Sequence, residues 1–189
     1  MSSPTETEIK LRVADKAAVL QRICDVGYAE SVPRVFEANT LYDTRDQQLR
    51  GREMLLRLRE VGGKHVITWK GPGIAGPHKS RPEIETTVGS AETMAGIFHQ
   101  LGFDPMFRYE KYRTEFRHPD KDGVITFDET PIGDYLELEG PAAWIDETAG
   151  MLGFTHADYI LDSYGKLYVA DCERRGIQPA DMVFAAPSR

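Results

Sequence analysis

The sequence has few residues that could form covalent cross-links, and it has no segment suited to a lipid bilayer. Two cysteines, Cys24 and Cys172, occur among 189 residues, far apart and without the spacing of metal ligands. We expect both thiols to be reduced and to lie on helices, with Cys24 in the core rather than acting as a nucleophile. The apolar runs are too short for a membrane span, and residues 1–5 lack the basic and apolar regions of a signal peptide. These absences favour a cytoplasmic protein without a membrane partner.

The chain also lacks an excess of positive charge and the common nucleotide-binding fingerprints. Its 23 Lys and Arg residues are outnumbered by 30 Asp and Glu residues, and the net charge of −7 argues against a nucleic-acid partner. There is no Walker A sequence and no H-E-x-x-H. Residues 71–76 match G-x-G-x-x-G, but Pro77 and Pro82 follow and prevent the helix that a dinucleotide site requires. We expect the five histidines to be surface residues: His65, His78, His99, His118 and His156.

What the sequence does contain is charge on every second residue of strand-like segments. The first segment reads Glu6-x-Glu8-x-Lys10, and the apolar residues Ile9 and Leu11 occupy the positions that alternate with the charged ones. Successive side chains of a strand point to opposite faces, so one face of such a strand is charged and the other is apolar. The same alternation recurs at residues 57–59, 68–70, 81–85, 111–115, 126–128 and 137–139.

A solvated outer face is the usual cause of such alternation. Here the charged sets share a composition of Glu, Arg and Lys with few Ser, Thr or Gln, and the sign changes from strand to strand. Ordinary solvent faces are less regular. We therefore expect the charged faces to meet inside a closed barrel, with the apolar faces outside and covered by helices.

Hydrophobic period and turn residues assign the remaining elements. We expect strands at residues 5–13, 34–43, 53–61, 64–70, 81–88, 107–117, 123–129 and 134–139. We expect helices at residues 15–26, 90–101, 141–152 and 162–175, a turn at 45–48 and a loop at 71–80. The result is an α+β fold: an eight-stranded antiparallel β-barrel with helices packed outside, in one domain over residues 1–176. The Pro- and Ala-rich residues 177–189 are expected to form a loosely ordered tail.

The mixture of charges indicates the chemistry of a ligand. Carboxylates on neighbouring strands supply oxygen ligands for Mg²⁺ or Mn²⁺, and Arg and Lys bind phosphate oxygens through charge-assisted hydrogen bonds. An anion alone would not need so many acids, and a metal alone would not need so many bases. The pattern therefore predicts a cage for a polyphosphate together with its metals.

The motifs resemble those of the CYTH superfamily, also called triphosphate tunnel metalloenzymes, over residues 6 to about 168. The E-x-E-x-K motif is Glu6-Thr7-Glu8-Ile9-Lys10, and it is followed in order by Leu56-Arg57-Leu58-Arg59, Thr68-Trp69-Lys70, Arg81-Pro82-Glu83-Ile84-Glu85, Lys111-Tyr112-Arg113, Asp128 with Glu137-Leu138-Glu139, and Ser163-Tyr164-Gly165-Lys166-Leu167. The second strand, Asn39-Thr40-Leu41-Tyr42-Asp43, departs from the family pattern, in which Gln or His often precedes Thr/Asp-x-Tyr.

This resemblance implies a set of roles for the charged residues. The implied metal ligands are Glu6, Glu8, Asp128, Glu137 and Glu139, with Glu85 nearby. The implied triphosphate ligands are Lys10, Arg57, Arg59, Lys70, Arg81, Lys111, Arg113 and Lys166. Catalytic roles fall to Glu6, Glu8, Lys10 and Arg113.

The activity that we expect is divalent-metal-dependent hydrolysis of a triphosphate: inorganic triphosphate, thiamine triphosphate or a nucleoside triphosphate. Segments 68–72 and 79–85 look more like the triphosphatase branch of the family than the cyclase branch. One alternative is a class IV adenylyl cyclase that converts ATP to cyclic AMP and pyrophosphate. A second is a non-catalytic polyphosphate or nucleotide binder. In each case the partner is a small molecule, and the chain is a monomer or a homodimer.

Overall fold

The structure, a computed structural model, describes residues 5–185. Its strands are β1 (Thr5–Val13), β2 (Ala29–Asp43), β3 (Leu55–Val61), β4 (Lys64–Lys70), β5 (Lys79–Val88), β6 (Asp104–Arg117), β7 (Val124–Thr130) and β8 (Gly133–Glu139). Its helices are α1 (Lys16–Asp25), α2 (Gln48–Gly51), α3 (Ala91–Gln100), α4 (Ala142–Met151) and α5 (Tyr164–Arg175), with a 3-10 turn at His156–Asp158.

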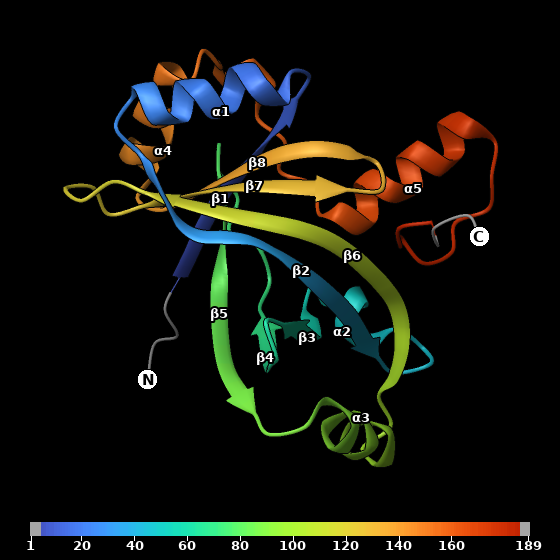
Figure 1. Cartoon of the computed structure of the whole chain (residues 1–189). Helices are drawn as coiled ribbons and strands as arrows, with labels where there is room; N and C mark the ends of the chain where they lie inside the picture. The colour runs from blue at the N-terminus through green and yellow to red at the C-terminus, as the bar shows by residue number, and fades with distance from the viewer. Residues whose placement is uncertain (1–4, 186–189) are drawn as a thin grey trace.

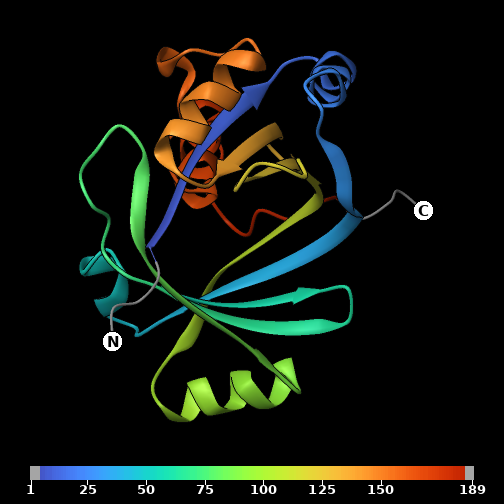
Figure 2. The same ribbon diagram turned by 90° about the vertical axis from the view of Figure 1, so that its left-hand side faces the viewer.

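The strands form a closed antiparallel barrel in the order β1-β5-β4-β3-β2-β6-β7-β8 (Figure 1). β8 pairs back with β1, so no edge strand is left exposed. Helices α1 and α4 lie together on one side of the barrel, and α3 lies at the opposite end (Figures 1 and 2). The expected eight-stranded barrel with helices outside is confirmed. Among residues 5–185, no helix has the length and apolarity needed to cross a bilayer.

The alternation in the sequence sorts the side chains into an inner and an outer set. In β1, Glu8 and Lys10 point into the barrel, and the register places them opposite Glu139 and Glu137 of β8. Their neighbours Ile9 and Leu11 point outward and are fully buried beneath helices. The protein therefore keeps its main hydrophobic core outside the barrel wall and its charges within it.

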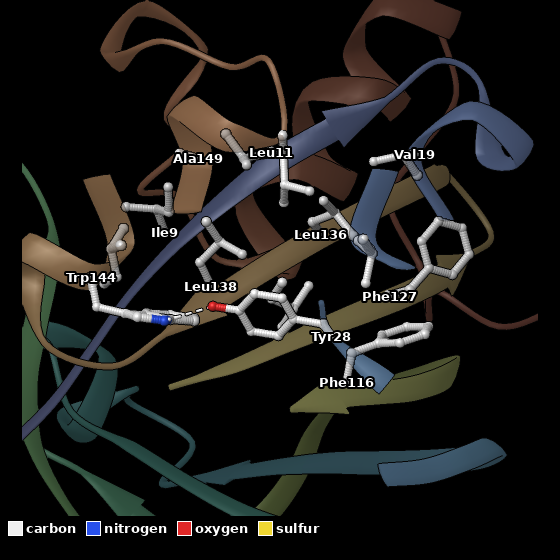
Figure 3. Packing of buried hydrophobic residues seen from close by; sticks show 14 residues of the cluster. Ile9, Leu11, Val19, Tyr28, Phe116, Phe127, Leu136, Leu138, Trp144 and Ala149 are labelled. Carbon is white, nitrogen blue, oxygen red and sulfur yellow. Dashed lines mark hydrogen bonds between the residues drawn. The ribbon is translucent and has the colours of Figure 1, made fainter. Parts of the chain in front are cut away.

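This outer core packs α1 and α4 against the β1–β8–β7 part of the wall (Figure 3). Leu136 and Leu138 of β8 lie in the same cluster as Val19 of α1 and Ala149 of α4. Each fully buried aliphatic side chain of this kind contributes about 1.5–3 kcal/mol through removal of apolar surface from water. The core thus supplies the stabilisation that a charged interior cannot.

Two helices begin at a side chain that caps their first turn. Asp15 accepts a hydrogen bond from the amide of Ala18 at 3.0 Å and begins α1, and Ser90 accepts one from Thr93 at 3.1 Å and begins α3. Gly27 follows α1 with a φ of +90°, a conformation that a side chain disfavours.

Most strand boundaries agree with the sequence-based expectation to within three residues, and the larger differences lie in β2 and in the segment that follows it. β2 begins at Ala29 rather than at 34, because its pairing with β6 continues past Pro33 through register shifts between Glu30 and Val35. The expected turn at 45–48 leads into the short helix α2. Its first amides are held by Asp43, whose carboxylate accepts hydrogen bonds from Leu49 and Arg50 at 2.9 Å each.

Two expectations about single side chains were wrong. His78 is buried rather than at the surface, because its Nε2 lies 2.8 Å from the Asp146 carboxylate of α4. This contact ties the loop before β5 to the helix layer. Cys24 is exposed on α1 rather than in the core, since Ile23 and Val19 form the buried face of that helix. Both cysteines are free thiols.

Part of the expected loose tail is packed. Met182 is 1% exposed, and its backbone exchanges hydrogen bonds of 2.9 Å with Arg108 and Glu110 of β6. Asp181 accepts a further bond from the Arg108 amide at 2.8 Å. The segment is held because β6 offers free backbone groups at this point. Residues 186–189 lie outside the described part of the chain.

The turn before β7 depends on a close approach between backbone and Trp144. A Cβ at Gly123 would lie 2.4 Å from the Trp144 ring, and that ring is fixed by a 2.8 Å hydrogen bond from its Nε1 to the Tyr28 hydroxyl. We expect Gly123→Ala to lower the free energy of unfolding by about 1–3 kcal/mol, as overpacking does. Urea unfolding would measure it.

Gly150 is the matched control, because it lies on the exposed side of α4 with no atom near an added Cβ. Gly150→Ala should raise stability by up to about 1 kcal/mol through helix propensity. Wild-type stability in the Gly123 variant would contradict the packing account.

Candidate active site

A cavity of about 370 Å³ lies inside the barrel, and charged side chains dominate its wall. The basic lining residues are Lys10, Arg57, Arg59, Lys70, Lys79, Arg81, Lys111, Arg113 and Arg117. The acidic lining residues are Glu6, Glu8, Glu83, Glu85, Glu115, Glu137 and Glu139. The strand alternation therefore brings nearly all of the site residues expected from the sequence to one enclosed space.

Carboxylates gather where β1 meets β8. Glu8 lies opposite Glu139 in the register, and Glu6 is two residues before Glu8 on the same face. Lysines separate these acids. The Lys10 ammonium lies 3.2 Å from Glu8 and 3.0 Å from Glu137. Lys79 lies 2.6 Å from Glu8, and Lys70 donates to Glu6 at 2.7 Å.

The carboxylates of this cluster influence one another's pKa. Burial, followed by the charge of Glu6, raises the pKa of Glu139 to about 7. Burial also opposes ionisation of Glu8, but the charges of Lys10, Lys79 and Lys70 together outweigh it and hold the pKa of Glu8 far below its usual range. A cation that reached Glu139 and Glu6 would relieve the repulsion between them.

The opposite wall, formed by β3 and β6, carries bases. Arg57 donates to Thr68 at 3.0 Å and to the Tyr109 hydroxyl at 3.4 Å, and its Nε is buried without a hydrogen-bond partner. Arg59 donates from Nε to the Asn39 amide oxygen at 3.0 Å. The cavity thus has an acidic side and a basic side, and guanidinium groups line the basic one.

Asp128 does not line the cavity, although the resemblance implied a metal ligand there. It is fully buried on the inner face of β7, covered by cavity-lining side chains, and accepts hydrogen bonds from Arg113 Nε at 2.7 Å, Lys111 at 2.8 Å and the Tyr164 hydroxyl at 2.7 Å. Both carboxylate oxygens are occupied by these donors. In this structure Asp128 orients Arg113 and Lys111, and Arg113 also contacts Glu137.

Lys166 is likewise placed outside the cavity. Its side chain is 74% exposed on α5, and its ammonium lies 3.5 Å from Asp162. The helix turns Tyr164 inward instead, and this ring lies 5.2 Å from the Lys10 ammonium and 5.3 Å from that of Lys111. Tyr164 belongs to the motif at residues 163–167. It faces the cavity because of its position on α5, which its residue type alone does not reveal.

Three further residues of the site were missed from the sequence. Lys79 lies on the same face of β5 as Arg81. The strand expected from the sequence starts at residue 81, two residues too late to include Lys79. Glu37 and Asn39 lie on the inner face of β2 and are 3% and 0% exposed. Their strand does not show the regular charge pattern of the others, so its inner face gave no signal.

Glu85, expected near the metals, lies on the basic side. It accepts a hydrogen bond from Thr68 at 2.9 Å and lies 3.7 Å from Arg57. Of the acids with an implied metal role, Glu6, Glu8, Glu137 and Glu139 lie together, and Glu83 joins them because Lys70 contacts both Glu83 and Glu6.

These carboxylates fit a divalent cation in their donor chemistry. Within residues 5–185 there is no ready-made group of His, Cys, Asp or Glu side chains in position to hold a metal ion. Lysines hold the acids instead, as described above. The set nevertheless consists of oxygen donors, which Mg²⁺ and Mn²⁺ prefer, and the raised pKa of Glu139, caused by burial and by Glu6, indicates an uncompensated acidic charge. A metal would therefore replace lysine contacts.

Comparisons with known proteins agree with this geometry. The family model for the CYTH domain matches residues 4–151. A Methanocaldococcus jannaschii protein, provisionally named an adenylate cyclase, is 31% identical over 142 residues, which are 75% of this chain and 80% of that protein. The chain belongs to the CYTH domain family.

Solved structures show the same fold at lower identity. A Vibrio parahaemolyticus protein, also provisionally named an adenylate cyclase, is 20% identical with a TM-score of 0.78 and covers 88% of this chain and 98% of its own. A Hippeastrum protein with a provisional adenylyl cyclase name and a dominant triphosphatase activity is 17% identical, with a TM-score of 0.61 and coverages of 92% and 97%. Both activities thus occur in the names of proteins similar to this chain.

Asp128 gives the sharpest stability test of the site. We expect Asp128→Asn to lower the free energy of unfolding by about 3–5 kcal/mol, because it removes a buried carboxylate charge that Arg113 and Lys111 share and leaves them only Glu137 and the more distant Glu37. Tyr164→Phe removes one donor to the same carboxylate and should cost about 0.5–3 kcal/mol. Chemical denaturation of both variants measures the difference, and an Asp128→Asn protein as stable as Tyr164→Phe would show that the charge is not essential.

Proposed function

We propose that the protein hydrolyses a triphosphate substrate with the help of a divalent metal ion. The observation that carries the proposal is the division of one cavity into an acidic side and a basic side. Carboxylates bind divalent metal ions, and Lys and Arg bind phosphate oxygens. A metal-bound triphosphate requires both kinds of side chain in one cavity.

The basic side supplies the contacts to phosphate. Arg57 and Arg81 line the cavity, and the Nε of each is buried without a hydrogen-bond partner among residues 5–185, although Arg81 Nε lies 3.6 Å from Glu6, so their guanidinium groups are not fully engaged by the protein. A hydrogen bond from a charged group contributes about 1.5–3 kcal/mol. The remaining bases proposed to hold triphosphate are Lys10, Arg59, Lys70, Lys111 and Arg113.

Glu6, Glu8, Glu137 and Glu139 would hold the metal. A bound divalent ion neutralises charge that develops on phosphate oxygens and lowers the pKa of water. Lys10 lies between Glu8 and Glu137, and Arg113 reaches Glu137 from the other wall. These two cations are placed where the two sides of the cavity meet, and we assign them the stabilisation of negative charge on the reacting phosphoryl group.

An adenylyl cyclase is the second candidate, and the provisional names of the relatives favour it. A cyclase would have to place adenine and direct the ribose hydroxyl at the α-phosphate. The apolar lining residues Leu41 and Leu55 are the part of the wall suited to a base. Binding without catalysis is disfavoured, because holding phosphate requires few carboxylates.

Product analysis separates these functions. The protein is incubated with inorganic triphosphate, thiamine triphosphate or ATP in the presence of Mg²⁺ or Mn²⁺, and the products are separated. The proposal predicts metal-dependent release of orthophosphate. Cyclic AMP with pyrophosphate as the main products from ATP would identify a cyclase, and tight binding without turnover would identify a binder.

Glu139 connects the proposed metal site with stability. We expect Glu139→Gln to abolish metal-dependent turnover while leaving the fold intact, since it removes a carboxylate from a repulsive cluster. Glu147→Gln on the exposed face of α4 is the control for loss of one charge. Near-normal turnover of the Glu139 variant at ordinary metal concentration would contradict the metal assignment.

The same variant should change the pH dependence of stability. The folded chain holds the Glu139 proton at pH values where the unfolded chain has lost it, so metal-free wild-type protein should lose stability as pH rises from about 4.5 to about 7. Glu139→Gln should weaken this loss. Thermal unfolding across the range measures it, and identical slopes for both proteins would show that Glu139 is not perturbed.

A further inference from the structure

Glu37 is a buried acid on the basic side of the cavity to which the proposed chemistry gives no task. It lies on β2 and is 3% exposed. Its Oε1 is 3.5 Å from Arg59 Nη1, and its Oε2 is 3.7 Å from the Lys111 ammonium. Among residues 5–185, Oε2 has no hydrogen-bond partner. A buried carboxylate oxygen without a partner is unfavourable, so this position calls for an explanation.

The contacts of Glu37 differ in kind from those of Asp128. Asp128 accepts hydrogen bonds of 2.6–2.8 Å from Arg113, Lys111 and Tyr164. The Glu37 contacts are longer, at 3.5 and 3.7 Å, which is at or beyond the limit of a hydrogen bond. Asp128 therefore fixes its bases, whereas Glu37 attracts Arg59 and Lys111 without binding them closely.

Glu37 is nevertheless ionised. Burial opposes its charge, but Lys111, Arg113 and Arg59 together lower the pKa of Glu37 to about 2. In the absence of substrate it is thus a negative charge that offsets the repulsion among the bases of β3 and β6. Those same bases are the ones assigned above to phosphate.

An entering triphosphate must draw these cations toward itself. Arg59 and Lys111 then lose part of their attraction to Glu37. The phosphate oxygens, on the other side of the two bases, are in addition repelled by the negative charge of Glu37. Both effects reduce the net gain on binding. Neither effect applies to Glu60, which follows Arg59 on β3 but has a 53% exposed side chain outside the barrel.

We propose that Glu37 is a positioning residue that attracts Arg59 and Lys111 in the empty tunnel and, as a competing anion, weakens triphosphate binding so that the anionic products can leave. This inference rests on the proposed function of the cavity. Under this inference Glu37 raises the stability of the protein without ligand and lowers its affinity for triphosphate.

Isothermal titration with inorganic triphosphate in the presence of EDTA tests the inference without turnover. We expect Glu37→Gln to bind about tenfold more tightly than wild type, a change of about 1.4 kcal/mol. Its melting temperature without ligand should be lower than that of wild type, and its rise on adding triphosphate should be larger. In steady-state assays with metal, KM should fall and kcat should not rise.

Two variants accompany Glu37→Gln. Glu60→Gln removes the same charge from the outside of the neighbouring strand and should leave the affinity nearly unchanged. Glu37→Asp keeps the charge that the fold uses but withdraws it by one methylene from both bases. It should bind triphosphate with an affinity between those of wild type and Glu37→Gln, and it provides the comparison if Glu37→Gln does not fold.

The outcomes separate the inference from the proposed function. If wild type binds triphosphate and the foldable Glu37 variants bind it equally well or more weakly, Glu37 only supports its neighbours and the inference is overturned, while the proposed function stands. If wild type does not bind triphosphate with or without Mg²⁺, the proposed function fails and the inference fails with it.

Discussion

Nearly all charges inside this barrel lie near a charge of the opposite sign, and the rest of the structure depends on that constraint. Removing an ion from water costs several kcal/mol, which an ion pair recovers only with good geometry. The antiparallel register provides the geometry by setting Lys10 of β1 opposite Glu137 of β8. The favourable energy of folding comes from elsewhere, mainly from the outer core in which α1 and α4 cover Ile9, Leu136 and their neighbours. The side chains that stabilise the fold and those proposed to bind the ligand thus lie on opposite faces of the same strands.

The internal ion pairs also define what the cavity can bind. The acids of β1 are held by lysines, whose flexible single charges can exchange partners, whereas Asp128 is held on both oxygens by Arg113. A ligand that brings its own cation and its own anion can replace lysine–carboxylate contacts without leaving an unpaired charge in the wall. A metal-bound triphosphate satisfies this condition. A neutral ligand does not, because it would leave the existing pairs in place and gain little from them.

The barrel and its charged interior could be predicted from the sequence because a period of two is a local property of a strand. Glu6, Glu8 and Lys10 lie on the expected face of β1, whose neighbours in the barrel are the distant strands β5 and β8. The positions of Asp128, Lys166 and Glu37 could not be predicted. Whether Asp128 faces the cavity depends on Tyr164, which reaches it from a helix 36 residues away in sequence. The packing of Met182 on β6 likewise depends on backbone groups that no local pattern reveals.

The central claim is that one cavity holds a metal on its acidic side and a triphosphate on its basic side. The most direct measurement is a crystal structure of the protein with inorganic triphosphate and Mn²⁺, with the metal located by its anomalous scattering. The account predicts a Mn²⁺ peak within coordination distance of carboxylates from the set Glu6, Glu8, Glu137 and Glu139, and phosphates in contact with Arg57 and Lys111. A metal bound away from these carboxylates, or a triphosphate outside the barrel, would contradict it.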